Sequence, residues 1–142
     1  MNTSTRKLID LVESQKIVNA DLFEAIDLDS VLDERDNDPF DREWMRCNDV
    51  VQSLLEEQGD VPEDVSDLAR QSFLAASNAT DQHDIASYVS DDFRLIAEAL
   101  SVGYEDQWLS SLLREYGRSQ FPTGVLRPSG QTLSEVIESL AG

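Results

Sequence analysis

The sequence has few of the side chains on which most enzymes depend. It contains one histidine, His83, and one cysteine, Cys47, which lie far apart in the chain of 142 residues. Catalysis near neutral pH usually draws on histidine, a reactive cysteine or a metal ion. The six glycines are scattered, so the sequence has no glycine-rich loop that could cradle a phosphate. We therefore expect a protein that is not an enzyme and that binds no cofactor.

Neither of these scarce residues points to a metal site. Cys47 lies on the apolar face of an expected helix, which favours a buried thiol over a reactive thiolate. His83 stands near an expected helix start, which favours an exposed side chain over a metal ligand. The aspartates of residues 27–38 fail the pattern of a calcium loop, because Asp41 occupies the position at which such a loop needs glycine. We expect no bound metal.

Long apolar runs are also missing. The longest candidate, residues 95–100, is interrupted by Glu98 and is far shorter than the roughly 20 residues that cross a bilayer. Asp10 and Glu13 fall where a signal peptide would need apolar residues. A single cysteine cannot form an internal disulfide, which agrees with a reducing compartment. The expected location is the cytoplasm, with no attachment to a membrane.

Basic residues are scarce, and this imbalance is the most informative feature of the composition. The chain has 29 acidic and 11 basic side chains and a formal net charge of −18. Residues 21–64 alone hold sixteen acids and three bases, a net −13, whereas residues 65–142 carry −6 and residues 1–20 carry +1. Such a field repels nucleic acid and anionic lipid and attracts basic protein surfaces. We expect a basic protein partner and no direct binding of nucleic acid.

Apolar residues are spaced by three and four along most of the chain, and this spacing predicts helices. Alternation with a period of two, flanked by hairpin turns, is not found, so a sheet is not expected. The chain has the size of one domain. We predict an all-α protein in which residues 1–142 form a single acidic domain, an irregular bundle of six to eight short and medium helices.

Capping residues predict where several helices begin and end. Asn19 should cap a helix that continues through Ile26, Gly103 should end the central helix, and Glu105 and Asp106 should begin the next one. Residues 27–38 should form a short helical turn followed by an exposed loop, and Asp38 and Pro39 should begin a helix that ends at Gly59. A brief helix after Thr80 should precede a central, most buried helix capped at residues 90–92. The prolines and glycines of residues 118–131 predict a loop, and residues 132–142 a terminal helix capped by Thr132.

The acidic segment has two interpretations. A run of acids is often only a solvated face that keeps a protein soluble. The alternative is a recognition surface, because so much like charge in 44 residues repels itself and a basic partner would relieve that repulsion. We favour the second interpretation. The candidate contact residues are Asp29, Asp33, Glu34, Asp36, Asp38, Phe40 and Asp41.

Phe40 is the one apolar residue among these candidates. It stands between Pro39 and Asp41, where an aromatic anchor ringed by acids would suit a basic surface. A phenylalanine at this position can equally act as a hydrophobic staple that fixes the start of the next helix. The sequence leaves both roles open.

The opening Leu8-Ile9-x-Leu11-Val12 motif, followed by Leu22-Phe23-Glu24 and acid-rich connections, resembles a known group of proteins. The chain is similar to the small, acidic, helical immunity proteins that protect bacteria from colicin-D-type and contact-dependent toxins. The resemblance implies tight one-to-one inhibition of a basic toxin domain, often a nuclease, through acidic side chains on one face. It transfers no individual contact residue, so the candidates above rest on charge density alone.

A second hypothesis remains beside this one. The chain could be an acidic regulatory module, or a mimic of DNA, that binds a nucleic-acid-binding protein. A DNA mimic would spread its acids along an elongated face at phosphate-like intervals, whereas a toxin inhibitor needs one compact patch. The concentration of acids in residues 21–64 favours the compact patch. The sequence does not determine the oligomeric state.

Overall fold

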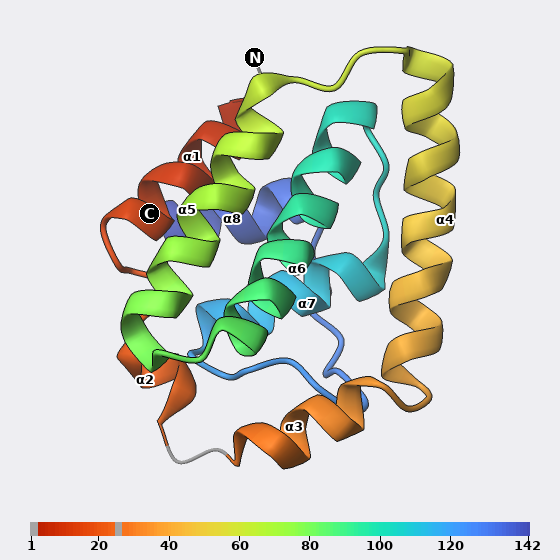
Figure 1. Ribbon diagram of the computed structural model, residues 1–142. Coiled ribbons are helices and arrows are strands. Elements are labelled where there is room, and N and C mark those ends of the chain that lie inside the picture. The colour runs from red at the N-terminus through yellow and green to blue at the C-terminus, as the bar shows by residue number, and fades with distance from the viewer. Residues whose placement is uncertain (1–2, 25–26) are drawn as a thin grey trace.

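The computed structural model describes residues 3–24 and 27–142, and these residues form eight α-helices and no β-strand (Figure 1). The prediction of an all-α bundle of six to eight helices is confirmed. The helices are α1 (Thr3–Glu13), α2 (Ala20–Phe23), α3 (Leu28–Arg35), α4 (Phe40–Gln58), α5 (Glu63–Thr80), α6 (His83–Val102), α7 (Gln107–Gly117) and α8 (Leu133–Ala141). The second helix was expected to extend to Ile26, which lies outside the described residues.

Helix α6 runs through the middle of the bundle, as Figure 1 shows, with α5 beside it and α4 along one edge. Eleven of its residues are buried, including Phe93 and Ile96, so the prediction of a central, most buried helix is confirmed. The predicted interruption at residues 90–92 is wrong, because α6 continues unbroken from His83. Val89, Phe93 and Ile96 follow one another at helical spacing along a single buried face, which keeps the helix continuous.

Most of the predicted helix ends are confirmed. Asn19 caps α2, and Asp106 caps α7 by accepting from the backbone N–H of Trp108 at 2.8 Å. Thr132 and Glu135 form a reciprocal capping box at the start of α8. Gly103 ends α6 with a φ of 71°, a left-handed conformation that glycine adopts without steric cost.

The prediction that Asp38 caps α4 is wrong, since the residue before the helix is Pro39 and no side chain caps it. The segment before it was expected to form a short helical turn followed by an exposed loop. The helix, α3, is longer than expected, with two turns, and residues 36–38 follow it as an exposed, non-helical segment. Its last residue, Arg35, is only 4% exposed. The long helix α4 ends at Gly59 as predicted, and residues 118–131 lack helix as predicted.

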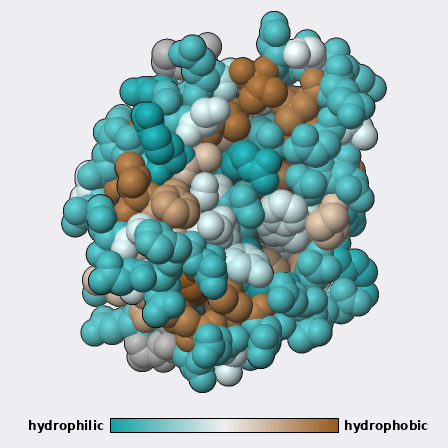
Figure 2. Space-filling model, viewed as in Figure 1, coloured by the Kyte–Doolittle hydropathy of each residue, from teal (hydrophilic) through white to brown (hydrophobic). Residues whose placement is uncertain are grey.

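Among the described residues, none of the helices is long and apolar enough to cross a membrane. Figure 2 shows that hydrophilic residues cover most of the visible face, with apolar residues gathered in a few small patches between them.

Candidate partner-binding site

The acidic helix α3 is amphipathic, and its two faces explain how the chain displays its carboxylates. Leu28, Val31 and Leu32 are partly buried against the core, and Arg35 continues this stripe at helical spacing. Asp29, Asp33 and Glu34 fall between these positions and are exposed. The side chain of Asp27 accepts from the backbone N–H of Ser30 at 3.4 Å and caps the helix. The apolar stripe thus turns the acids outward.

A buried ion pair fastens the end of α3 to the centre of the bundle. The guanidinium of Arg35 donates to both carboxylate oxygens of Asp92, at 2.9 and 2.7 Å. Asp92 lies on α6 and is completely buried. Bidentate pairs between arginine and a carboxylate fix geometry as well as charge. The pair therefore sets both the position and the rotation of α3 relative to α6.

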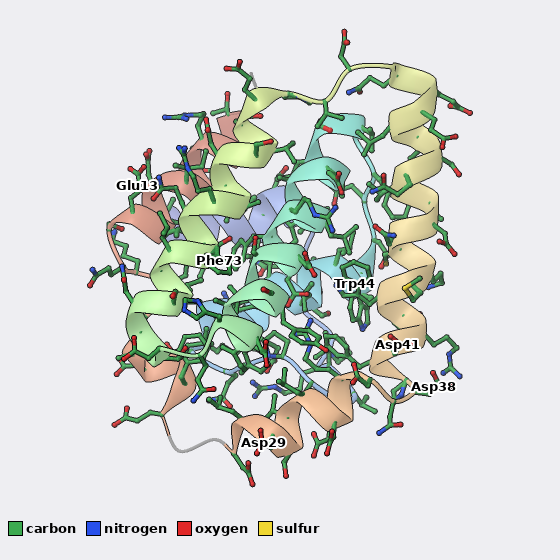
Figure 3. All side chains as sticks on the ribbon, in the orientation of Figure 1. Glu13, Asp29, Asp38, Asp41, Trp44 and Phe73 are labelled. Atoms are coloured by element: carbon green, nitrogen blue, oxygen red, sulfur yellow. The ribbon has the colours of Figure 1, made fainter. Side chains whose placement is uncertain are left out.

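Two further donors make Asp92 the centre of a larger cluster. The indole Nε1–H of Trp44 donates to Asp92 Oδ1 at 2.9 Å, and the hydroxyl of Tyr116 donates to Oδ2 at 2.6 Å. Trp44 lies on α4 and points toward α6 (Figure 3), and Tyr116 lies on α7. One carboxylate therefore binds side chains from three other helices. We call Arg35, Trp44, Asp92 and Tyr116 the Asp92 cluster.

Burial and charge act in opposite directions on the titration of this cluster. Desolvation disfavours the charged form of Arg35, but attraction and hydrogen bonds to Asp92 prevail, so the pKa of Arg35 is raised. Burial and the negative charge of Asp92 together raise the pKa of Tyr116 well above its ordinary value. The phenol therefore stays protonated and keeps donating to the carboxylate.

The loop after α7 also contacts α3. The main-chain carbonyl of Pro122 accepts a 3.4 Å hydrogen bond from Arg35, and Phe121 lies 5.2 Å from the Arg35 guanidinium. On the surface, the Thr123 hydroxyl donates to Glu34 at 3.3 Å. The predicted loop of residues 118–131 thus contacts the end of α3.

A second polar contact holds α4 in place. Arg46 donates to both oxygens of Asp106, at 2.9 and 3.2 Å, while Asp106 also caps α7. Partial burial acts to raise the pKa of Asp106, but the bonds from Arg46 and Tyr104 hold it below its ordinary value. Beside this pair Cys47 is fully buried, and burial raises its pKa to about 12. The prediction of a core cysteine is confirmed.

The structure places the predicted contact residues around one corner of the molecule, where α3 meets the start of α4. Asp29, Asp33, Glu34 and Asp36 lie on or directly after α3, Asp38 lies in the turn before α4, and Asp41 lies in the first turn of α4. All six are exposed, and Figure 3 shows Asp29 near the start of α3 and Asp38 and Asp41 beside its junction with α4. We call these six residues the acidic corner.

Phe40 differs from its acidic neighbours, and the expectation of an exposed aromatic anchor is not met. Its side chain is only 2% exposed. It packs edge-on against Trp108 with ring centres 5.1 Å apart, and the Arg35 guanidinium lies 4.4 Å from its centre. These contacts fit the alternative role at the helix start, so Phe40 supports the surface from beneath.

Sequence reasoning missed the Asp92 cluster. Asp92 was assigned to a helix cap, and Arg35 was counted only as a base within an acidic segment. A signal was present, because Asp92 falls on the face of Val89 and Ile96 and so requires a buried cationic or donor partner.

The described residues contain no group of histidine, cysteine or carboxylate side chains that could hold a metal ion. His83 is exposed, as expected, and its ring stacks on Phe73 with centres 6.1 Å apart. The acidic corner, with the buried Asp92 cluster beneath it, is therefore kept as the candidate surface for partner binding.

Comparison with known proteins adds an independent finding. No curated protein is similar enough in sequence to match the chain. The sequence profile of the family described as Immunity protein PIM1 does match, over residues 7–123. This stretch is most of the chain, from α1 to the loop after α7, and it includes the whole acidic corner and the Asp92 cluster. The chain therefore belongs to the immunity protein PIM1 family.

Proposed function

We propose that this immunity protein neutralises the basic, substrate-binding domain of a toxin, in the first instance a nuclease, by covering it with the acidic corner. The main support for the proposal is a group of six exposed carboxylates on α3, on the start of α4 and in the turn between them. The buried ion pair between Arg35 and Asp92 holds this part of the chain in place. A nuclease needs a positive cleft to hold phosphates, and an acidic surface of fixed shape complements such a cleft.

The charges of the acidic corner are largely uncompensated within the chain. Among the ion pairs of the described residues, only Asp38 of the six is involved, through an exposed contact of 3.7 Å with Arg42. Exposed pairs of this kind contribute little to stability. The corner therefore keeps a strong negative field that can accelerate association with a cationic protein and make it sensitive to salt.

Binding, and not catalysis, accounts for this arrangement. The lone thiol has a raised pKa and is buried, and the lone imidazole, His83, is exposed at the start of α6 and stacks on Phe73. Inhibition by occlusion needs only a stable surface, and cytoplasmic expression in a bacterium would place the protein where such a toxin acts. We propose that role.

The direct test needs a candidate toxin, which we expect to be a basic domain encoded in a neighbouring reading frame. Its nuclease activity is measured against increasing amounts of this protein at low and high salt. We expect inhibition that is complete at one equivalent, with association slowed by salt. A nuclease that keeps full activity at excess inhibitor in low salt would contradict the proposal.

A pair of charge-matched variants locates the surface. Alanine at Asp33, Glu34, Asp36 and Asp38 should weaken inhibition strongly, while the helical circular dichroism signal is retained. The control replaces four acids on other helices whose side chains are exposed or half-exposed: Asp10, Glu13, Asp67 and Asp84. Equal losses in the two variants would mean that net charge alone matters. Displacement of DNA from several unrelated binders would instead favour the DNA-mimic hypothesis.

A further inference from the structure

A small cavity opens beside the Asp92 cluster, bounded by the end of α3, the start of α4 and the middle of α6. Its volume is about 170 Å³. Arg35 and three aromatic residues form its inner wall, and three aspartates and Met45 form its rim. It therefore lies inside the acidic corner, but it is an aromatic hollow and not merely a group of acids.

We propose that this cavity receives a single lysine or arginine side chain of the basic partner. This inference rests on the proposed function and makes it specific, because it names the point on the acidic corner where one cationic residue is anchored. Central, water-excluded anchors of this kind dominate the energetics of many protein interfaces.

The inner wall suits a cation on a long apolar stem. Phe40, Trp44 and Tyr88 line the cavity, and aromatic faces attract ammonium and guanidinium groups within about 6 Å. The protein already uses two of these rings in this way, since Arg35 lies 4.4 Å from the centre of Phe40 and 5.3 Å from that of Tyr88. Arg35 does not repel a second cation strongly, because Asp92 neutralises it.

The rim supplies the negative charge. Asp36, Asp41 and Asp91 line the cavity and are exposed. Tyr88 donates to Asp36 at 3.3 Å, which holds that carboxylate at the rim. Of the three aspartates only Asp91 forms an ion pair within the described chain, with Arg94 at 3.6 Å. A cationic head group at the rim would thus meet two carboxylates, those of Asp36 and Asp41, that are not already in an ion pair.

A second, independent feature of the wall is an unused donor. Within the described residues the Nε–H of Arg35 has no hydrogen-bond partner, although the side chain is only 4% exposed. Buried donors nearly always have acceptors, and one without an acceptor is costly. The Nε atom is itself inaccessible to water, so a main-chain carbonyl oxygen of a bound segment would reach it only after the Arg35 side chain shifts. A basic peptide residue, which brings such oxygens with it, suits this wall better than a free metal ion.

Met45 completes the rim. Its side chain is 45% exposed, one of the larger apolar exposures in the described chain. Methionine is flexible and packs well against partners of varied shape. Here it can cover the methylene groups of an inserted side chain.

The test needs no toxin. The intact, isotopically labelled protein is titrated with N-acetyl-arginine N-methylamide, with its lysine counterpart, and with its citrulline counterpart, which is neutral and nearly the same shape as arginine. We expect the arginine or lysine compound to shift the Arg35 Nε–H, the Trp44 indole N–H and the Met45 methyl resonances in a saturable way. The Trp108 indole N–H should stay in place. The compound that binds more tightly identifies which cation the cavity prefers.

Two charge-matched variants provide the control. Replacing Asp36 and Asp41 by asparagine should weaken the arginine or lysine compound about fivefold or more. Replacing Asp29 and Asp33 by asparagine removes the same charge elsewhere on the acidic corner and should leave binding nearly unchanged. Equal weakening in both variants, shifts as large with the citrulline compound, or no saturable shift would each overturn the inference.

The outcome can be separated from that of the proposed function. A toxin that is inhibited equally by the parent protein and by the Asp36→Asn, Asp41→Asn variant would overturn the anchor while leaving the immunity function intact. A cavity that binds the arginine compound in a protein that inhibits no toxin would support the anchor chemistry and contradict the proposed function.

Discussion

Removal of the Asp92 carboxylate should destabilise the whole bundle. In Asp92→Ala the guanidinium of Arg35 would remain buried without its counter-ion, and the Trp44 indole N–H and Tyr116 hydroxyl would lose their acceptor. Breaking a buried ion pair from one side typically costs about 3–5 kcal/mol. For a chain of 142 residues, with a melting temperature that changes by about 4 °C per kcal/mol, the expected loss is about 12–20 °C.

Urea and thermal unfolding, followed by circular dichroism, measure this loss. The neighbouring variant Asp91→Ala is the control, because its exposed pair with Arg94 should contribute less than about 1 kcal/mol. The double variant Arg35→Met, Asp92→Leu should be less destabilised than Asp92→Ala, since it leaves no unpaired buried charge. Similar stability of Asp92→Ala and Asp91→Ala would refute the view that this cluster holds α3 and α4 in place.

Three other predictions concern separate parts of the bundle. The thiol of Cys47 is buried and has a pKa of about 12, so about one thiol in ten thousand is ionised at pH 8. The native protein should therefore be unreactive toward a disulfide reagent at pH 8, whereas the protein in denaturant should react rapidly. Fast reaction of the native protein would contradict this prediction. Asp106→Asn should cost about 1 kcal/mol at pH 7. Because the folded pKa of Asp106 is lowered, the contribution of its charge to stability is complete above the ordinary pKa of 3.8 and is lost as the pH falls below it. The parent protein and Asp106→Asn should therefore have similar stability in urea unfolding at acid pH. A stability difference that stays constant with pH would show that the charge is not involved. Thr132→Ala breaks the capping box of α8 and should lower stability by about 1 kcal/mol, whereas Ser134→Ala, one exposed position inside the helix, should change it little.

Much of the fold could be predicted from the sequence because each helix carries local signals. Spacing of apolar residues identified α1, α4, α5 and the buried helix α6, and cap residues such as Asn19, Gly103 and Thr132 located their ends. These signals act within one or two turns of the chain. They are therefore readable without knowledge of any tertiary contact.

The errors arose where a distant contact decides the local structure. Asp92 looks like a helix cap because it follows Ser90 and Asp91, but Arg35, 57 residues earlier, converts it into a buried acceptor within a continuous helix. Phe40 looks like a surface residue because acids surround it in sequence, yet Trp108 and Arg35 enclose it in space. Charge density predicted where the acids gather, but not the cavity among them, because its walls come from three helices.

The Asp92 cluster separates the part of the molecule that must stay fixed from the part that can vary. The acids of the corner contribute no side chain to the core, so each can be exchanged for another polar residue at small cost to folding. The buried carboxylate of Asp92 cannot be replaced on its own without a large loss of stability. Under the proposed function, the contact residues can therefore change one at a time while the helices that carry them keep their positions.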